Sequence, residues 1–229
     1  MEKPLYPSQY MRITEGYMKG SHRDSYAIDD AGIDQGIDYL KAPYTGVIKK
    51  IYQKDANEIW LESIEPVIYP DGTVDYLTML FAHDNDISNL FVGKVIAKGE
   101  RFYEEGTKGE ATGNHVHMEC GKGKFTNSGW HKNNSGHWSI NNAKNPTECL
   151  WIDDSITIIN DNGYKFRKIE KEENPKKPQE EIITEEPKKE ESTKEDSQNL
   201  QLIYTCRKSD TYAINLNNGD KLYIEKYKP

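Results

Sequence analysis

Residues 113–119 read GNHVHME, and this stretch indicates the fold class more clearly than any other part of the chain. Val116 and Met118 alternate with His115 and His117, which is the period-two pattern of a β-strand with one buried face. The two imidazoles then share a face and lie about 7 Å apart. Such a pair can serve one site, with one ring binding a metal and the other meeting a substrate. Two solvent-exposed surface histidines are the alternative, and a two-residue motif does not decide between them.

Strand-like segments with β-branched and aromatic residues recur on both sides of this stretch. Turn signals such as Pro70-Asp71-Gly72 separate them, and residues 87–91 are expected to form at most a single helical turn. The sequence therefore predicts an all-β fold with an antiparallel sheet core. The expected strands are Gly46–Tyr52, Glu58–Ile64, Val74–His83, Val92–Ala97 and His115–Glu119.

Composition excludes several classes of protein. The chain has 229 residues, of which 35% are apolar, and a formal charge of −8. Bulk charge does not hold such a protein on nucleic acid, so no nucleic-acid partner is expected. No apolar run approaches the roughly 20 residues of a membrane span, and the first twenty residues lack the apolar core of a signal peptide. We therefore expect synthesis in the cytoplasm, without a signal peptide or a membrane span.

Three regions are expected along the chain. Residues 1–165 form the main domain, and residues 166–198 form a charged linker. Between 168 and 198 there are seven lysines and eleven acidic residues, three prolines and no aromatic residue, so this part is expected to be disordered rather than a long helix. Residues 199–229 return to strand composition with a hairpin turn at 217–220. About three strands in so short a module are marginally stable alone, so it is expected to pair with another copy or to bind a ligand.

Two further features have plain interpretations. The cysteines Cys120, Cys149 and Cys206 are odd in number and widely spaced, so we expect buried thiols rather than disulfides or a metal knuckle. Residues 122–142 are rich in Gly, Ser and Asn and also contain Trp130 and Trp138. They are expected to form a long loop, of the kind that often carries function.

A second group of candidate ligands lies near the N-terminus. His22 and Asp29 can supply one nitrogen and one oxygen to zinc, which accepts mixed ligands of this kind. Asp29 follows the strand-like residues 26–28, which are expected to fix its position. Asp24 and Asp30 are rival ligands, although turn or cap carboxylates are the preferred interpretation for both.

The order of motifs along residues 20–150 resembles the lysostaphin-type, or LytM-like, zinc metallopeptidases, which cut the peptide part of bacterial peptidoglycan. The His–Asp motif comes first and is followed by a turn, a strand that ends in Phe81-Ala82-His83, a glycine-containing segment and the histidine pair. This many motifs in the same order are a stronger signal than any one of them. The matching segments after His22 and Asp29 are APYTGV (42–47), FAH (81–83), LFVGKVIAKG (90–99), GTKG (106–109), TGNHVH (112–117) and NP (145–146).

Carried over residue by residue, the resemblance implies that His22, Asp29 and His117 bind Zn²⁺, and that His83 and His115 are the catalytic histidines. It implies a zinc endopeptidase that acts on peptidoglycan after release, as a phage endolysin or a virion-associated lysin does. Residues 199–229 are then expected to bind the cell wall or to form a homo-oligomer.

Several alternatives stay open. A non-catalytic relative that binds peptidoglycan or a partner protein is the second hypothesis, and a structural phage or surface protein is the third. The remaining histidines, His131 and His137, are expected to be solvated loop residues because the three-ligand set is complete without them. The bond that is cut, and the division of roles between His83 and His115, do not follow from the sequence.

Overall fold

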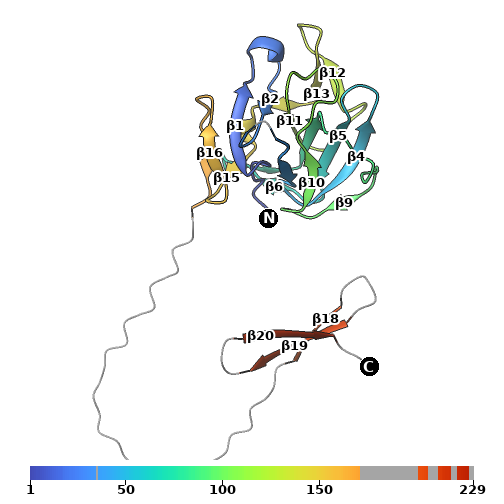
Figure 1. Cartoon of the computed structure of the whole chain (residues 1–229), viewed down its shortest axis with the longest axis vertical. Coiled ribbons are helices and arrows are strands. Elements are labelled where there is room, and N and C mark those ends of the chain that lie inside the picture. The colour runs from blue at the N-terminus through green and yellow to red at the C-terminus, as the bar shows by residue number, and fades with distance from the viewer. Residues whose placement is uncertain (35, 171–200, 206–210, 218–220, 227–229) are drawn as a thin grey trace, which may run out of the picture. The chain divides into compact units, whose positions relative to one another are not determined.

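A computed structural model describes residues 1–34, 36–170, 201–205, 211–217 and 221–226, the last three segments by their backbone only (Figure 1). The chain divides into two compact units, Met1–Asn174 and Pro175–Pro229. Residues 171–200, which include most of the predicted linker (166–198), lie outside the described residues.

A nine-stranded sheet forms the framework of the first unit (Figure 1). Along the sheet the order is β16-β1-β2-β11-β8-β5-β4-β9, and β14 also pairs with β11. All neighbours are antiparallel except β1 and β16. The predicted all-β class with an antiparallel core is therefore confirmed. The strands are β1 (Tyr10–Glu15), β2 (Ile28–Asp30), β4 (Gly46–Tyr52), β5 (Glu58–Ser63), β8 (Leu77–Ala82), β9 (Val95–Ile96), β11 (Val116–Lys122), β14 (Ala143–Lys144) and β16 (Thr157–Asn160).

The expected strands are found with some changes of length. Strand β4 has the predicted bounds, and β5 ends one residue early. The segment expected as one strand from Val74 splits at Tyr76 into β7 (Val74–Asp75) and β8, and His83 lies just beyond β8. Only Val95–Ile96 of the expected 92–97 strand pairs. Residues 87–90 form a hydrogen-bonded turn instead of a helical turn, closed by the Leu90 amide on the Ile87 carbonyl.

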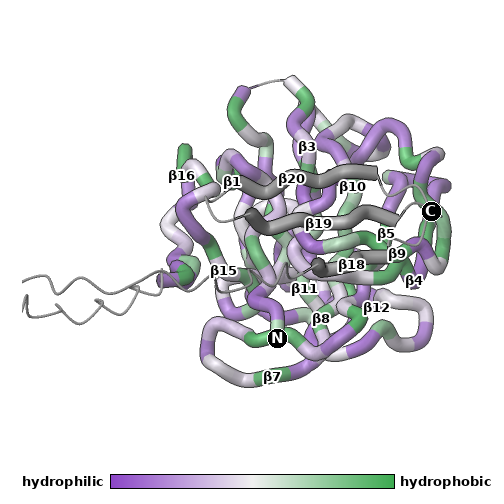
Figure 2. Tube along the Cα trace, turned by 90° about the horizontal axis from the view of Figure 1, so that it is seen from below, coloured by the Kyte–Doolittle hydropathy of each residue, from purple (hydrophilic) through white to green (hydrophobic). Residues whose placement is uncertain are grey.

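The central strands bury side chains on both faces of the sheet. In β8, Leu77, Met79 and Phe81 join the main core, whereas Leu80 joins a second cluster with Trp60 and Ile140. Because successive side chains of a strand point to opposite faces, each face of β8 has its own apolar cover. Hydrophobic stretches accordingly run through the strands, and the connecting loops are mainly hydrophilic (Figure 2).

The cover of the second face comes from the segment that was expected to be a long loop. Residues 122–142 contain a β-hairpin of β12 (Trp130–Lys132) and β13 (Trp138–Ile140), so the loop prediction is wrong. Trp60 donates its indole N–H to the Gly129 carbonyl at 3.0 Å, and Ile140 packs against Trp60. Tertiary packing on Trp60 therefore orders a segment whose polar composition alone suggests a loop.

Short paired elements complete the unit. They are β3 (Tyr39–Lys41) with β10 (Arg101–Glu104), β6 (Val67–Ile68) with β7, β15 (Trp151–Ile152) with β17 (Arg167–Lys168), and the 3₁₀ helices η1 (Gly20–His22) and η2 (Pro146–Glu148). Cys120 and Cys149 are buried free thiols, as expected, and Cys206 lies outside the described residues.

The second unit contains a three-stranded antiparallel sheet of β18 (Gln201–Thr205), β19 (Thr211–Asn217) and β20 (Lys221–Lys226). Strands β19 and β20 pair from Asn217 and Lys221 outward, and the predicted turn between them, residues 218–220, lies outside the described residues. In the described part of the chain, no helix has the length and apolar character needed to cross a membrane.

Candidate metal centre and cleft

The register of three neighbouring strands brings the candidate ligands together. His117 of β11 lies opposite Asp29 of β2 on one side and Ala82 of β8 on the other. Residues directly opposite one another in an antiparallel pair project from the same face. Since Val116 and Met118 belong to the main core, His117 and Asp29 project from the second face of the sheet. His22 reaches the same place from η1, where it is buried.

His22, Asp29 and His117 offer three ligand atoms within 4.8 Å of one another. Asp29 Oδ1 lies 3.3 Å from His22 Nε2 and 3.1 Å from His117 Nδ1. Ligands held about 2.0–2.2 Å from zinc at tetrahedral angles are about 3.3–3.6 Å apart. Two imidazole nitrogens and one carboxylate oxygen at these separations therefore fit a three-ligand zinc site with a fourth position open.

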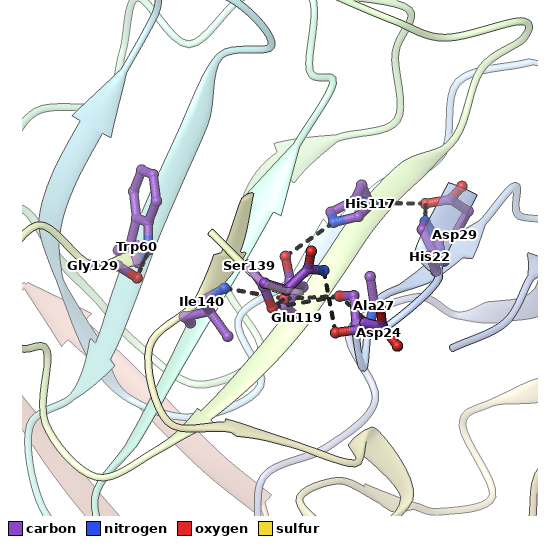
Figure 3. A network of polar contacts seen from close by, with 12 residues as sticks. His22, Asp24, Ala27, Asp29, Trp60, His117, Glu119, Gly129, Ser139 and Ile140 are labelled. Carbon is purple, nitrogen blue, oxygen red and sulfur yellow. Dashed lines mark hydrogen bonds and ion pairs between the residues drawn. The ribbon is translucent and has the colours of Figure 1, made fainter. Parts of the chain in front are cut away.

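Glu119 supports His117 from the side opposite Asp29 (Figure 3). Its Oε1 lies 3.4 Å from His117 Nε2, while its Oε2 accepts hydrogen bonds from Ser139 Oγ at 2.5 Å, the Ile140 amide at 3.1 Å and Ser25 Oγ at 3.3 Å. A carboxylate on the outer nitrogen of a metal-binding histidine fixes the tautomer and the ring orientation. Sequence reasoning missed this residue, although its place two residues after His117 put it on the same strand face.

Hydrogen bonds stabilise the charged forms of this group. Burial opposes the charge on His117, but the contacts with Asp29 and Glu119 raise its pKa to about 10. Burial also opposes ionisation of Asp29 and Glu119, yet the contacts with the histidines and, for Glu119, with Ser139 and Ile140 hold both pKa values below their ordinary range. The group is thus a charged network in which the ring of His117 lies between the carboxylates of Asp29 and Glu119.

His83 has an unusual backbone conformation directly after β8. Its φ is +90°, a region in which a non-glycine residue is strained by about 1–3 kcal/mol. Three hydrogen bonds hold it there: its amide donates to the Ala56 carbonyl, its carbonyl accepts from the Lys108 amide, and its ring Nδ1 donates to the Lys108 carbonyl at 2.8 Å. Burial, reinforced by His117 and His115, lowers the pKa of His83 to about 4. The ring is therefore neutral at pH 7, with Nε2 as its free acceptor.

His115 lies one residue before β11, beside both His83 and the ligand group. Its ring centroid is 4.5 Å from that of His83, and its Nε2 is 3.7 Å from Asp29 Oδ2. Its Nδ1 donates to the Gly113 carbonyl at 2.9 Å, which leaves Nε2 to face the site. All five residues singled out in the sequence thus lie in one group.

The rival carboxylates have other surroundings. Asp30 projects to the opposite face of β2, where it is fully buried and accepts the Arg12 amide at 2.8 Å. Asp24 is exposed and accepts a hydrogen bond from Ser135 of the β12–β13 hairpin. His131 and His137 are exposed on or beside that hairpin, and neither belongs to the group of three ligand atoms.

Two cavities meet at the site. One, of about 320 Å³, is lined by His22, Asp29, His83, His115 and His117, and also by residues of the β4–β5 loop and of the hairpin. The other, of about 650 Å³, includes Asp29 and His115 again, together with Arg12 and Asn114. The histidine group is therefore open to a ligand from two sides.

No protein-family model matches the chain. Morphogenesis protein 1 of Bacillus phage B103 is 30% identical over 168 residues, which cover 71% of this chain and 43% of that protein. The chain thus spans less than half the length of this relative.

Among solved structures, the chain overlaps in part with three peptidase-type proteins. They are a zinc-containing peptidase from Vibrio cholerae (16% identity, 52% of this chain and 37% of that one, TM-score 0.38), the catalytic domain of the prophage-encoded M23 protein EnpA from Enterococcus faecalis (19%, 55% and 93%, 0.39) and lysostaphin from Staphylococcus simulans (18%, 58% and 65%, 0.39).

Proposed function

We propose that this protein is a zinc-dependent endopeptidase that hydrolyses peptide bonds of bacterial peptidoglycan. One observation carries the proposal: His22, Asp29 and His117 converge at zinc-ligand spacing, with the imidazoles of His83 and His115 beside them in an open cavity. Three protein ligands with one free position are the arrangement of catalytic zinc sites. We propose peptidoglycan as the substrate because the motifs in residues 20–150 resemble those of LytM-like peptidases.

Zinc, when bound, supplies Lewis acidity that activates water and polarises the scissile carbonyl. The chain contributes positioning and proton transfer. Neutral His83 accepts a proton through Nε2, because its Nδ1–H is held by the Lys108 carbonyl. His115, with Nδ1 held by the Gly113 carbonyl, is placed to exchange a proton with the reacting group or to stabilise its negative charge. Glu119 keeps the ring of His117 in one orientation.

Metal analysis and a turbidity assay on purified cell walls test the proposal. His117→Ala should lose zinc, because one of three ligands is removed. His115→Ala should keep zinc and lose lysis, because a catalytic group is removed and the ligands stay. His131→Ala, an exposed histidine of β12 outside the cavity lining, is the matched control and should keep both. A wild-type protein without zinc and without lysis on any wall type would overturn the proposal in favour of a non-catalytic binding protein.

The setting we propose is a bacteriophage. The relative from Bacillus phage B103 is named a morphogenesis protein, which favours a lysin carried by the virion over an endolysin released at the end of infection. Mass spectrometry of purified virions tests this, since a virion-associated lysin is found in the particle and an endolysin is not.

A further inference from the structure

The cavity of about 320 Å³ beside the histidines has side walls that the proposed hydrolysis does not use. The β12–β13 hairpin supplies one wall, and the β4–β5 loop with residue Glu110 supplies the other. The two walls differ in chemistry, and together they indicate what kind of substrate group fits between them.

The hairpin wall is aromatic. Trp138 is 54% exposed, and its ring centroid lies 5.1 Å from that of Trp130, which in turn lies 4.9 Å from Tyr52. Two lysines that are not part of the cavity lining lie against these rings: Lys50 Nζ is 3.7 Å from the Trp130 ring centroid, and Lys132 Nζ is 5.4 Å from that of Trp138. An exposed indole in a cavity offers apolar contact to a flexible aliphatic chain as well.

A second part of the lining is acidic. Asp55, Glu58 and Glu110 line the cavity, and no Lys or Arg does. In the described part of the chain, none of the three forms an ion pair within 4.0 Å. Burial raises the pKa of Glu58, and the charge of Lys50 offsets this only in part.

Asp55 and Glu110 belong to loops that touch. A Cβ at Gly109, which has φ +89°, would lie 2.9 Å from Ala56 Cβ and 3.1 Å from the Asp55 carbonyl oxygen. The loops are also linked through His83, which bonds to both Ala56 and Lys108. Asp55 and Glu110 therefore belong to neighbouring loops beside His83, and both line the cavity.

We propose that this cavity binds a substrate side chain that ends in an ammonium group, as the diamino acid of a wall stem peptide does. The methylene chain packs against Trp138 and Trp130, and the ammonium group lies between Asp55 and Glu110. Long cationic side chains place apolar stems on apolar surface and keep the charged head near polar partners, which matches the order of the two walls. This inference rests on the proposed function and adds the class of peptide that the enzyme selects.

Equilibrium binding to zinc-loaded His115→Ala protein tests the inference without catalysis. The probes are the stem peptide L-Ala-D-Glu-L-Lys-D-Ala with a free side-chain amine and the same peptide with that amine acetylated. We expect the peptide with the free amine to bind about fivefold more tightly than the acetylated peptide at low salt. The ratio of the two affinities should fall towards one at about 0.5 M NaCl, because salt screens the attraction between the ammonium group and two mainly exposed carboxylates.

Substitutions assign the effect to the two walls. In the His115→Ala background, Asp55→Asn with Glu110→Gln should abolish the preference for the free amine, and Glu65→Gln, an exposed carboxylate outside the cavity, should keep it. Trp138→Ala should weaken both peptides alike by about two- to fivefold, and Phe91→Ala, which is 61% exposed elsewhere, should not.

The outcomes separate this inference from the proposed function. Equal affinity for the two peptides, or no binding of either, overturns the ammonium site even if the wild-type protein lyses walls. A preference for the free amine that Asp55→Asn with Glu110→Gln removes supports the ammonium site even if no wall is lysed, in which case the catalytic proposal alone fails.

Discussion

Asp29 and Asp30 are adjacent in the chain and have opposite surroundings. Asp29 faces two histidines on one side of the sheet, and Asp30 is fully buried on the other. The difference follows from strand alternation in β2 together with the pairing of Asp29 with His117. Strand register thus decides which carboxylate lies beside the histidines, and residue type does not distinguish Asp29 from its neighbours.

Glu119 is expected to control zinc affinity without being a ligand. Glu119→Gln keeps acceptors for Ser139 and Ile140 but removes the charge that holds the outer N–H of His117. Loss of such support weakens metal binding by about 10- to 100-fold. Competition with a chromophoric chelator measures this, and Glu65→Gln is the control. Wild-type affinity in a folded Glu119→Gln protein would contradict the role assigned to Glu119.

Glu105 is expected to make stability depend on pH. Burial, and then the charge of Asp30, raises the pKa of Glu105 to about 8, whereas an unfolded glutamate titrates near about 4.3. Between these values the folded state binds more protons than the unfolded state. The stabilising contribution is therefore present below about pH 4.3 and is lost as pH rises through about 8.

Glu105→Gln should remove this dependence, because the amide does not ionise. The thermal midpoint of the variant should exceed that of the wild type by an amount that grows between about pH 4 and pH 8. Parallel curves for variant and wild type across this range would contradict the assignment. Glu105 Oε1 also lacks a partner among the described residues, and an amide N–H₂ beside Asp30 offers a donor in its place.

At the scale of elements, the β12–β13 hairpin contacts both the candidate site and an apolar cluster on the sheet. Its residue Ser139 bonds to Glu119, and Ile140 packs on Trp60 and Leu80. The hairpin therefore covers an apolar part of the second sheet face and orients the carboxylate behind His117. Its strands are short and polar outside these contacts, so its order depends on the sheet beneath it.

Alanine substitutions at two glycines in this region test how tightly the hairpin segment is packed. Gly129 and Gly136 have φ values of +86° and +81°, so alanine at either costs about 1–2 kcal/mol in backbone strain. A Cβ at Gly136 meets nothing within 4 Å, whereas one at Gly129 would lie 2.5 Å from Phe125 Cε2 and 2.9 Å from Trp60 Nε1. Gly129→Ala should thus destabilise the protein more than Gly136→Ala in chemical denaturation. Equal losses of stability in the two variants would contradict this, because they would mean that the contacts of Gly129 with Phe125 and Trp60 relax without a measurable cost in free energy.

At the scale of the whole molecule, the first unit is expected to fold by itself. Its core runs from Tyr6 to Ile152, with Tyr164 and Phe166 packed against it. A truncated protein of residues 1–174 should therefore keep the thermal midpoint and the bound zinc of the full chain. A loss of several degrees in the midpoint would contradict this and would assign part of the stability to residues 175–229.

Sedimentation of the two proteins tests what residues 199–229 do. We propose that this module binds the wall or forms an oligomer. If it forms an oligomer, the full chain sediments above its mass of 26.4 kDa and the truncated protein does not. If it binds the wall, both are monomers, and the truncated protein loses co-sedimentation with purified walls.

Local patterns in the sequence determined the all-β class and most of the central strands, and the order of motifs along the chain pointed to His22, His83 and the pair His115 and His117. Alternation in residues 113–119 places His115 and His117 on one face because a strand repeats every two residues. The bounds of β4 and the buried thiols of Cys120 and Cys149 follow from local composition in the same way.

The tertiary structure alone decided which aspartate joins His22, how His83 is held, and that residues 122–142 form a hairpin. Each depends on contacts between segments far apart in sequence: Asp29 with His117, His83 with Lys108, and Ile140 with Trp60. Strand pairing and burial set these contacts, and the conformational propensity of a single residue does not predict them. Glu119 is the clearest case. Ser139 and Ile140, which lie far from it in sequence, donate the hydrogen bonds that hold its carboxylate beside His117.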